Sequence, residues 1–203
     1  MAKIKYTKNE LKKQRDLLAR FRRYLPTLEL KRQQLQIEVR KVEGIIREKK
    51  AAEERLIDGM QSWIRLFSDV IEFHSYLKVS EIVVKTTNIA GVGIPVFSGV
   101  KFDRGKINLF ATDPWLDDGL DALEELIILR CETRTLAEQH RLLSEELLVT
   151  TQRVNLFEKV KIPECSENIR VIRIFLGDQD AAAVVRSKIA KGKSADMMAG
   201  VRE

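Results

Sequence analysis

The chain has 203 residues, of which 33% are charged and only 6% aromatic, and it carries a formal net charge of +6. This composition is typical of long-helix proteins rather than compact α/β enzymes. No apolar run is long enough to span a membrane, and the basic first residues are not followed by the apolar core of a secretory signal. Cys131 and Cys165 lack metal-ligand spacing, so we expect free thiols in a reducing cytoplasm.

A seven-residue apolar repeat runs through the first third of the chain. Fifteen of twenty seam positions are apolar, and one register holds for ten heptads. A repeat of 3.5 residues sustained over this length predicts a left-handed coiled coil, because a straight helix has 3.6 residues per turn. The seam positions are Leu11, Gln14, Leu18, Phe21, Leu25, Leu28, Arg32, Leu35, Val39, Val42, Ile46, Lys49, Glu53, Leu56, Met60, Trp63, Phe67, Val70, His74 and Leu77.

Four residues interrupt the regularity of this helix. Pro26 removes one backbone hydrogen bond and predicts a kink, whereas Gly44 and Gly59 weaken the helix without ending it. Lys49 breaks the apolar seam, and antiparallel pairing would place it near Glu145 and Glu146, with Arg141 near Glu53. Two interpretations of this polar stretch stay open: a layer that fixes register and a solvated gap.

The pattern changes after residue 78, where Val, Ile, Thr and Gly replace Leu, Lys and Glu. Ile82–Thr87 and Pro95–Phe102 are predicted strands of a hairpin. Asp103–Gly105 is a predicted turn, and Lys106–Phe110 a predicted third short strand. The glycine-rich stretch between residues 91 and 99 lacks the features of a nucleotide-binding loop and indicates turns.

A second helix is predicted from Asp113 as N-cap, with Pro114 as its first residue. Asp117 and Asp118 then lie near the positive end of the helix dipole. Pro163 is expected to interrupt this helix. Its seam positions are Leu126, Leu129, Thr133, Leu136, His140, Leu143, Leu147, Thr150, Val154, Phe157, Ile169, Ile172 and Leu176.

These elements predict a mainly α fold, a long antiparallel two-helix coiled coil with a small β-hairpin element between the helices. The whole chain, residues 1–203, is expected to form a single rod-like domain. Its expected parts are a first long helix (1–78), a β-containing segment (79–112), a second long helix interrupted near Pro163 (113–191) and a flexible tail (192–203).

Charge is distributed unevenly along the chain. Residues 1–32 carry a net charge of +8, residues 113–146 one of −7 and residues 168–203 one of +3. Antiparallel helices place both chain ends together, which predicts a basic tip at one end of the rod and a neutral to acidic other end. The acidic residues that begin the second helix form either a solvated face or a docking surface: Asp117, Asp118, Asp121, Glu124 and Glu125.

Catalytic patterns are absent from the sequence. It contains no serine–histidine–aspartate, HExxH or paired-carboxylate arrangement. His74 and His140 occupy seam positions that antiparallel pairing keeps far apart, so we expect packed seam histidines rather than metal ligands. Three interpretations of the basic tip stay open at this point: a solvated face, a nucleic-acid contact and docking to an acidic protein surface.

Four segments resemble one protein family. The segment TTQRVNLFEKVKIPE at 150–164 resembles the stretch before the last helix of the central-stalk D subunit of V-type and archaeal-type rotary ATPases. The segments NIAGVGIPVF at 88–97 and DPWLDDGLD at 113–121 are similar to its central part and to the start of its second long helix. The basic, leucine-containing segment TKNELKKQRDLLARFRRYLPTLELKRQQL at 7–35 is similar to its first helix, although uninterrupted helix is expected in the family where Pro26 falls.

This resemblance implies a rotor axle that is not itself an enzyme and binds no cofactor. The implied partners are the catalytic and non-catalytic nucleotide-binding subunits, the small F subunit of the stalk and the funnel-like subunit on the membrane ring. The implied location is cytoplasmic and peripheral to the membrane, with no nucleic acid bound and with either H⁺ or Na⁺ as coupling ion. A prefoldin-like chaperone subunit and a basic nucleic-acid-binding coiled coil are the alternatives.

A basic tip suits contact with carboxylate-bearing loops of a surrounding ring, because charge attraction acts over several ångströms without requiring one fitted orientation. The residues expected to make this contact are Lys8, Lys12, Arg15, Arg20, Arg22, Arg23, Arg170, Arg173, Arg186 and Lys188.

Overall fold

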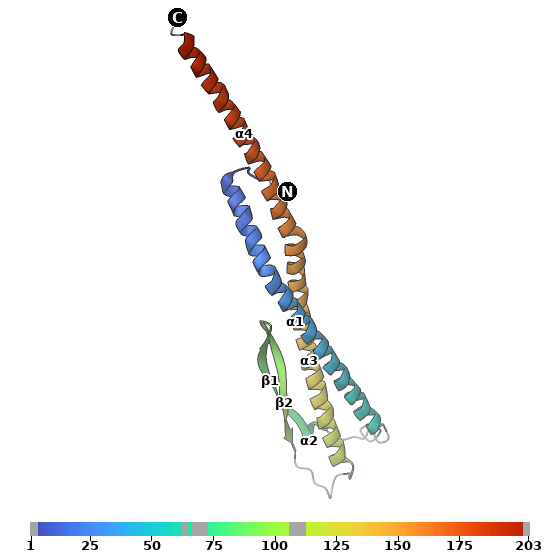
Figure 1. The fold of residues 1–203 in the computed structure, drawn as a ribbon. Helices are drawn as coiled ribbons and strands as arrows, with labels where there is room; N and C mark the ends of the chain where they lie inside the picture. Colours follow the sequence, from blue (N-terminus) through green and yellow to red (C-terminus); the bar gives the residue numbers. More distant parts are fainter. Residues whose placement is uncertain (1–3, 62–64, 66–72, 106–112, 201–203) are drawn as a thin grey trace. The chain divides into compact units, whose positions relative to one another are not determined.

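A computed structural model of the chain describes residues 4–61, 65, 73–105 and 113–200 (Figure 1). The fold is mainly α, with one two-stranded antiparallel sheet between the long helices. The elements in chain order are α1 (Lys8–Met60), α2 (Phe73–Tyr76), β1 (Leu77–Ile89), β2 (Val92–Arg104), α3 (Leu116–Leu156), a π-helical turn η2 (Phe157–Lys161) and α4 (Ile162–Gly200).

The chain divides into two compact units. The terminal unit consists of residues 1–30 and 151–203, and the hairpin unit of residues 31–150. The terminal unit therefore contains the start of α1, the end of α3, η2 and α4. The hairpin unit contains the rest of α1 and α3 together with α2 and the hairpin.

The predicted seam is confirmed in both helices. Every seam position from Leu11 to Met60 is buried or half-buried, and so is every predicted seam position from Leu126 to Leu176. The helices pair in antiparallel fashion within the hairpin unit, because Lys31 contacts Glu146 whereas Lys49, further along α1, contacts the earlier residue Glu132.

The first helix is shorter than predicted. It ends at Met60, directly after Gly59, rather than near residue 78. Asp58 closes this end, since its carbonyl accepts from the backbone N–H of Gln61 at 3.2 Å and its carboxylate accepts from the side-chain amide of Gln61 at 2.9 Å. The predicted seam positions Trp63, Phe67 and Val70 lie outside the described residues.

Residues 73–78 were predicted to belong to this same helix, which is wrong. His74 belongs to the four-residue helix α2, and Leu77 is the first residue of β1. Leu77 is nevertheless buried, because it packs against Leu116 and Leu120 at the start of α3. The heptad rule therefore predicted correctly that Leu77 is buried, but it assigned the residue to the wrong apolar cluster.

Pro26 does not break α1, which continues through it. A proline inside a helix leaves the carbonyl four residues earlier, here that of Arg22, without its usual backbone donor. Both Pro26 and Arg22 are exposed, so water can satisfy that carbonyl.

The hairpin is longer than the predicted strands, and its turn has two residues. Ala90 and Gly91 have positive φ angles of 51° and 83°, the conformation that a two-residue hairpin turn of type I′ requires at both positions. The Asn88 side chain stabilises the turn by accepting from the backbone N–H of Gly91 at 2.9 Å.

The turn predicted at Asp103–Gly105 is wrong, because β2 continues through Arg104. Gly105 is instead a point of close approach. Its N–H donates to the carbonyl of Tyr76 at 2.9 Å, and a Cβ at this position would lie 2.5 Å from the carbonyl oxygen of Ser75. The predicted third strand, Lys106–Phe110, lies outside the described residues.

The second helix begins at Leu116, two residues after the predicted first residue Pro114, and extends further than predicted. Pro114 lies in a turn before α3, and the backbone carbonyl of Asp113, not its side chain, accepts from the N–H of Leu116 at 3.1 Å. Pro163 does not interrupt the helical run, because η2 leads directly into α4. The segment 192–200, predicted as a flexible tail, is also helical.

The tip of the hairpin packs against both long helices of the hairpin unit. Ile94 of β2 is 2% exposed and joins Leu35 of α1 and Leu143 of α3 in one apolar cluster. The side-chain amide of Gln139 donates to the carbonyl of Pro95, which satisfies a buried polar group. The hairpin thus forms a third layer on the two helices. Neither heptad periodicity nor strand composition predicted this packing.

Ion pairs connect the base of the hairpin to the start of α3. The guanidinium of Arg104 lies 2.7 Å from Asp121, 2.9 Å from Asp117 and 3.9 Å from Glu124. Burial would lower the pKa of Arg104, but the hydrogen bond to Asp121 and the three nearby carboxylates raise it above its ordinary value. Part of the acidic face predicted at the start of the second helix is therefore an internal contact.

The polar seam residues find different partners from those predicted. Lys49 lies 2.8 Å from Glu132, and Glu53 lies 2.8 Å from Arg130, whereas Arg141 pairs within its own helix. The predicted partners of Lys49 are more than three helical turns further along α3. The prediction is wrong because it required the helices to meet near residue 79, whereas α1 ends at Met60.

Among the residues that the structure describes, no helix is both long and apolar enough to cross a membrane.

Replacing Ile94 with Ala should lower the free energy of unfolding of the hairpin unit by about 2–5 kcal/mol, since it leaves a cavity beneath the hairpin tip. Ile82, which is 48% exposed on β1, is the control, and Ile82→Ala should change stability by less than about 0.5 kcal/mol. Urea denaturation followed by circular dichroism measures both. Equal effects of the two substitutions would contradict the packing of the tip.

A double-mutant cycle on Lys49 and Glu132 should give a coupling of about 0.2–1 kcal/mol, because both side chains are partly solvated. Lys49→Leu alone should leave helicity intact but allow more than one register, measured by cysteine cross-linking between α1 and α3. A single register in Lys49→Leu would refute the register-fixing layer and support a solvated gap.

Candidate interaction surface

Both ends of the chain belong to the terminal unit, where α1 lies against α3, η2 and α4. Two aromatic pairs mark this contact: the ring centroids of Tyr6 and Phe175 are 5.0 Å apart, and those of Phe21 and Phe157 are 4.9 Å apart. The early residue pairs with the later one, so the helices are antiparallel here as well. The basic segments at the two chain ends are therefore part of one unit, as predicted.

All ten basic residues predicted to contact a partner are exposed. The seam faces of α1 and α4 are occupied by apolar contacts, which leaves the long basic side chains in water. Six of them belong to α1: Lys8, Lys12, Arg15, Arg20, Arg22 and Arg23. The other four belong to α4: Arg170, Arg173, Arg186 and Lys188.

Three of these arginines converge on one groove. Arg15 and Arg22 of α1 and Arg173 of α4 line a groove of about 340 Å³, whose floor includes Leu18 and Ile169. Within the described part of the chain, none of the three arginines forms an ion pair. Three uncompensated guanidinium groups around one groove favour binding of a carboxylate-bearing partner.

Two other predicted residues share a separate hollow. Lys12 and Arg20 line it on α1 together with Lys13 and Asp16. The carboxylate of Asp16 lowers the net positive charge of this hollow. The hollow is therefore a weaker candidate for anion binding than the groove between Arg15, Arg22 and Arg173.

The remaining α4 residues differ in their surroundings. Arg170 lies 2.6 Å from Glu167, and the hydrogen bond between them raises the pKa of Arg170 and lowers that of Glu167. Its charge is thus already paired. Arg186 and Lys188 belong to a stretch of α4, residues 177–194, in which every residue is exposed.

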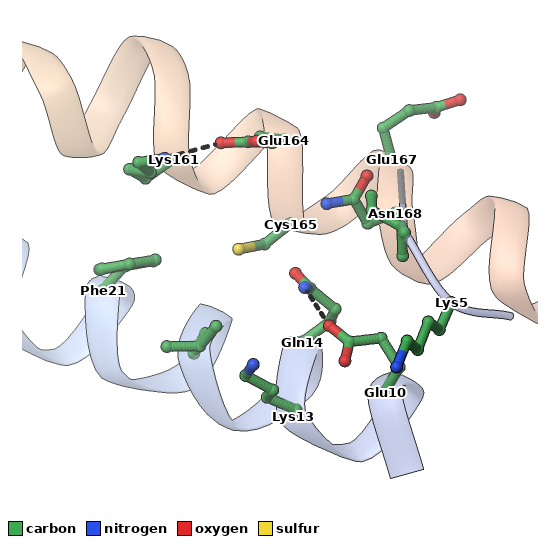
Figure 2. Close-up of a pocket in the computed structure, with 12 residues that line it drawn as sticks. Lys5, Glu10, Lys13, Gln14, Phe21, Lys161, Glu164, Cys165, Glu167 and Asn168 are labelled. Atoms are coloured by element: carbon green, nitrogen blue, oxygen red, sulfur yellow. Dashed lines mark hydrogen bonds and ion pairs between the residues drawn. The ribbon is translucent and has the colours of Figure 1, made fainter. Parts of the chain in front are cut away.

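A larger groove of about 690 Å³ lies between α1 and the start of α4 (Figure 2). In its polar part, the side-chain amide of Gln14 donates to Glu10 at 2.8 Å, and Lys161 lies 3.0 Å from Glu164. Cys165 is 4% exposed, and its sulfur points toward α1 (Figure 2). Burial, reinforced by the charge of Glu164, raises the pKa of this thiol.

The remaining candidate groups have structural contacts. Nε2 of His140 lies 3.0 Å from a carboxylate oxygen of Glu43, across the seam of the hairpin unit. The side chain of His74 lies outside the described residues. No group of three or more potential metal ligands occurs in the described ranges.

Comparison with known proteins identifies the family. The sequence profile for the D subunit of ATP synthase matches residues 10–192. The chain belongs to this family. It is 47% identical over 191 residues to the D subunit of the V-type ATP synthase of Borreliella burgdorferi, an alignment that covers 94% of the chain and 95% of that relative. It is 36% identical to the corresponding protein of Chlamydia muridarum, over 95% of the chain and 96% of the relative.

Membership of the D-subunit family confirms the resemblance carried by the four segments. A relative from Chlamydia pneumoniae, also named as the D subunit of a V-type ATP synthase, is 34% identical over 94% of the chain and 92% of its own length. The chain thus spans nearly the full length of these relatives. The family assignment identifies the chain as the D subunit of a V-type ATP synthase.

Sequence reasoning missed two features that modify this surface. Glu167 forms an ion pair with Arg170. This pair could have been predicted from the sequence, because residues three apart lie on the same face of a helix. The convergence of Arg15 and Arg22 with Arg173 could not be predicted from the sequence, because it depends on the register between α1 and α4.

In the native protein, Cys131 should be alkylated before Cys165, by roughly tenfold or more, because a buried thiol with a raised pKa forms little thiolate. Mass spectrometry of the labelled peptides measures this, with the urea-unfolded chain as the control for full reactivity. Equal rates in the native protein would contradict the packing of Cys165 against α1.

Proposed function

We propose that this protein is the non-catalytic rotor axle of its V-type ATP synthase, transmitting rotation between the nucleotide-binding ring and the ion-translocating membrane ring. The terminal unit contacts the ring of catalytic and non-catalytic subunits. Other parts of the chain contact the small F subunit and the funnel-like subunit on the membrane ring. The chain itself binds no cofactor and acts in the cytoplasm at the membrane surface, with H⁺ or Na⁺ as the coupling ion.

The groove bounded by Arg15, Arg22 and Arg173 carries this proposal. It combines unpaired positive charge from both ends of the chain with a partly apolar floor. Charged contacts at the rim of an interface attract a partner over a distance without fixing one tight orientation. A rotating shaft requires that property, since deep apolar packing would trap it at one angle.

The hairpin unit supplies the stiffness that such a role requires. Ion pairs cross between α1 and α3 at Lys31–Glu146, Lys49–Glu132 and Glu53–Arg130. Each pair contributes only about 0.2–1 kcal/mol, but together with the apolar cluster beneath the hairpin they resist sliding of one helix along the other. A single helix of the same length has no such brace.

The triple variant Arg15→Gln, Arg22→Gln and Arg173→Gln should bind the nucleotide-binding ring roughly tenfold or more weakly, because it removes the unpaired charge of the groove. The matched control, Arg40→Gln, Arg47→Gln and Lys50→Gln, removes the same charge from exposed positions of α1 in the hairpin unit. The control should retain ring binding.

Reconstitution of the ring with each variant, followed by affinity measurement and ATP-driven ion transport, checks this prediction. Normal binding and coupling by the groove variant would refute the assigned surface. Recovery of nucleic acid or of unfolded client proteins in place of the ring would instead support one of the two alternative functions.

A further inference from the structure

The seam of the second helical run changes phase once. Up to η2 it follows alternating steps of three and four residues through Thr150, Val154 and Phe157. Continuing these steps predicts the next seam positions as Lys161, Glu164, Asn168 and Val171. That series is largely polar, which is unsuitable for a coiled-coil seam.

The structure buries a different series. Cys165 is 4% exposed, Ile169 7% and Ile172 0%, and each lies one residue after the position that the regular steps predict. Glu164, by contrast, is exposed. Figure 2 shows the sulfur of Cys165 directed toward α1. The seam has therefore moved by one residue between Phe157 and Cys165.

The π-helical turn occupies this interval. The backbone N–H of Ile162 donates to the carbonyl of Phe157, five residues earlier, instead of four residues earlier as in an α-helix. A π turn thus accommodates one more residue than an α turn. One extra residue is what the change of seam phase requires.

Pro163 explains why the extra residue is accommodated here. Proline has no N–H to donate, and in a regular α-helix its ring clashes with the carbonyl four residues earlier, here that of Lys159. A wider turn in front of Pro163 relieves that clash. The proline predicted to interrupt the helix is thus compatible with a continuous helical run.

We propose that η2 and Pro163 form a one-residue phase corrector, which fixes the face of α4 that packs against α1. Without it, α4 would be rotated by about 100° relative to α3, the rotation of one residue in an α-helix. Glu164 and Asn168 would then enter the seam, and Ile169 and Ile172 would leave it. The same rotation would turn Arg173 away from Arg15 and Arg22.

The test compares a deletion with an insertion at the same place. Val160 is 48% exposed within η2, so its deletion removes the extra residue without removing a buried side chain. In a Pro163→Ala background, the deletion should convert η2 to α-helix and keep Ile169 and Ile172 in the seam. An alanine inserted after Val160 in the same background adds a second extra residue and should displace them.

Cross-linking between Tyr6→Cys and Phe175→Cys reports the phase, because the two native rings are in contact. Cys131 and Cys165 are replaced by Ala, a short bifunctional maleimide is used, and Tm is measured in parallel on the full chain. We expect the deletion variant to keep the cross-link and the Tm of the Pro163→Ala parent. We expect the insertion variant to lose most of the cross-link and to have a lower Tm.

This asymmetry distinguishes a phase corrector from a local irregularity. If deletion and insertion reduced the cross-link and Tm equally, or if neither did, the proposal would be overturned. The readouts are taken on the isolated chain, so they do not depend on the proposed role in the rotary complex.

Discussion

Burial of one apolar strip along α1 is the constraint on which the other contacts depend. A helix pair has no enclosed core, so its stability comes from side chains that meet along a seam. Leu35 and Val42 of α1 are almost fully buried there, and the interhelical ion pairs lie beside them. Because a shift of one residue moves apolar side chains out of a seam, the seam determines within each unit which charged groups face one another across the helices.

The hairpin turns part of this two-helix seam into a three-layered core. Ile94 reaches the strip between α1 and α3, and Arg104 joins the base of β2 to the start of α3. Apolar burial at the tip and charge at the base hold the hairpin at both ends. The side of β1 that bears Ile82 and Val84 stays exposed, so the hairpin both stabilises the helices and presents a surface of its own.

The seam residues, both strands and the family resemblance could be predicted from sequence, because periodicity and β-branched composition are local signals. The partners of Lys49 could not, since register depends on where α1 ends, and neither Gly59 nor Asp58 is a strong enough breaker to reveal that end. The placement of Arg173 beside Arg15 and Arg22 could not be predicted for a related reason. It depends on the π turn before Pro163, and the heptad rule treats a proline as an interruption rather than as the site of one extra residue.

A rotor axle turns relative to the nucleotide-binding ring, and single-molecule observation of rotation tests the proposed role of this protein most directly. A bead attached through Lys85→Cys, an exposed position of β1, would be followed in an assembled complex whose ring is fixed to a surface. The account predicts that ATP drives continuous rotation of the bead in one direction. A bead that stays fixed to an actively hydrolysing ring would contradict it.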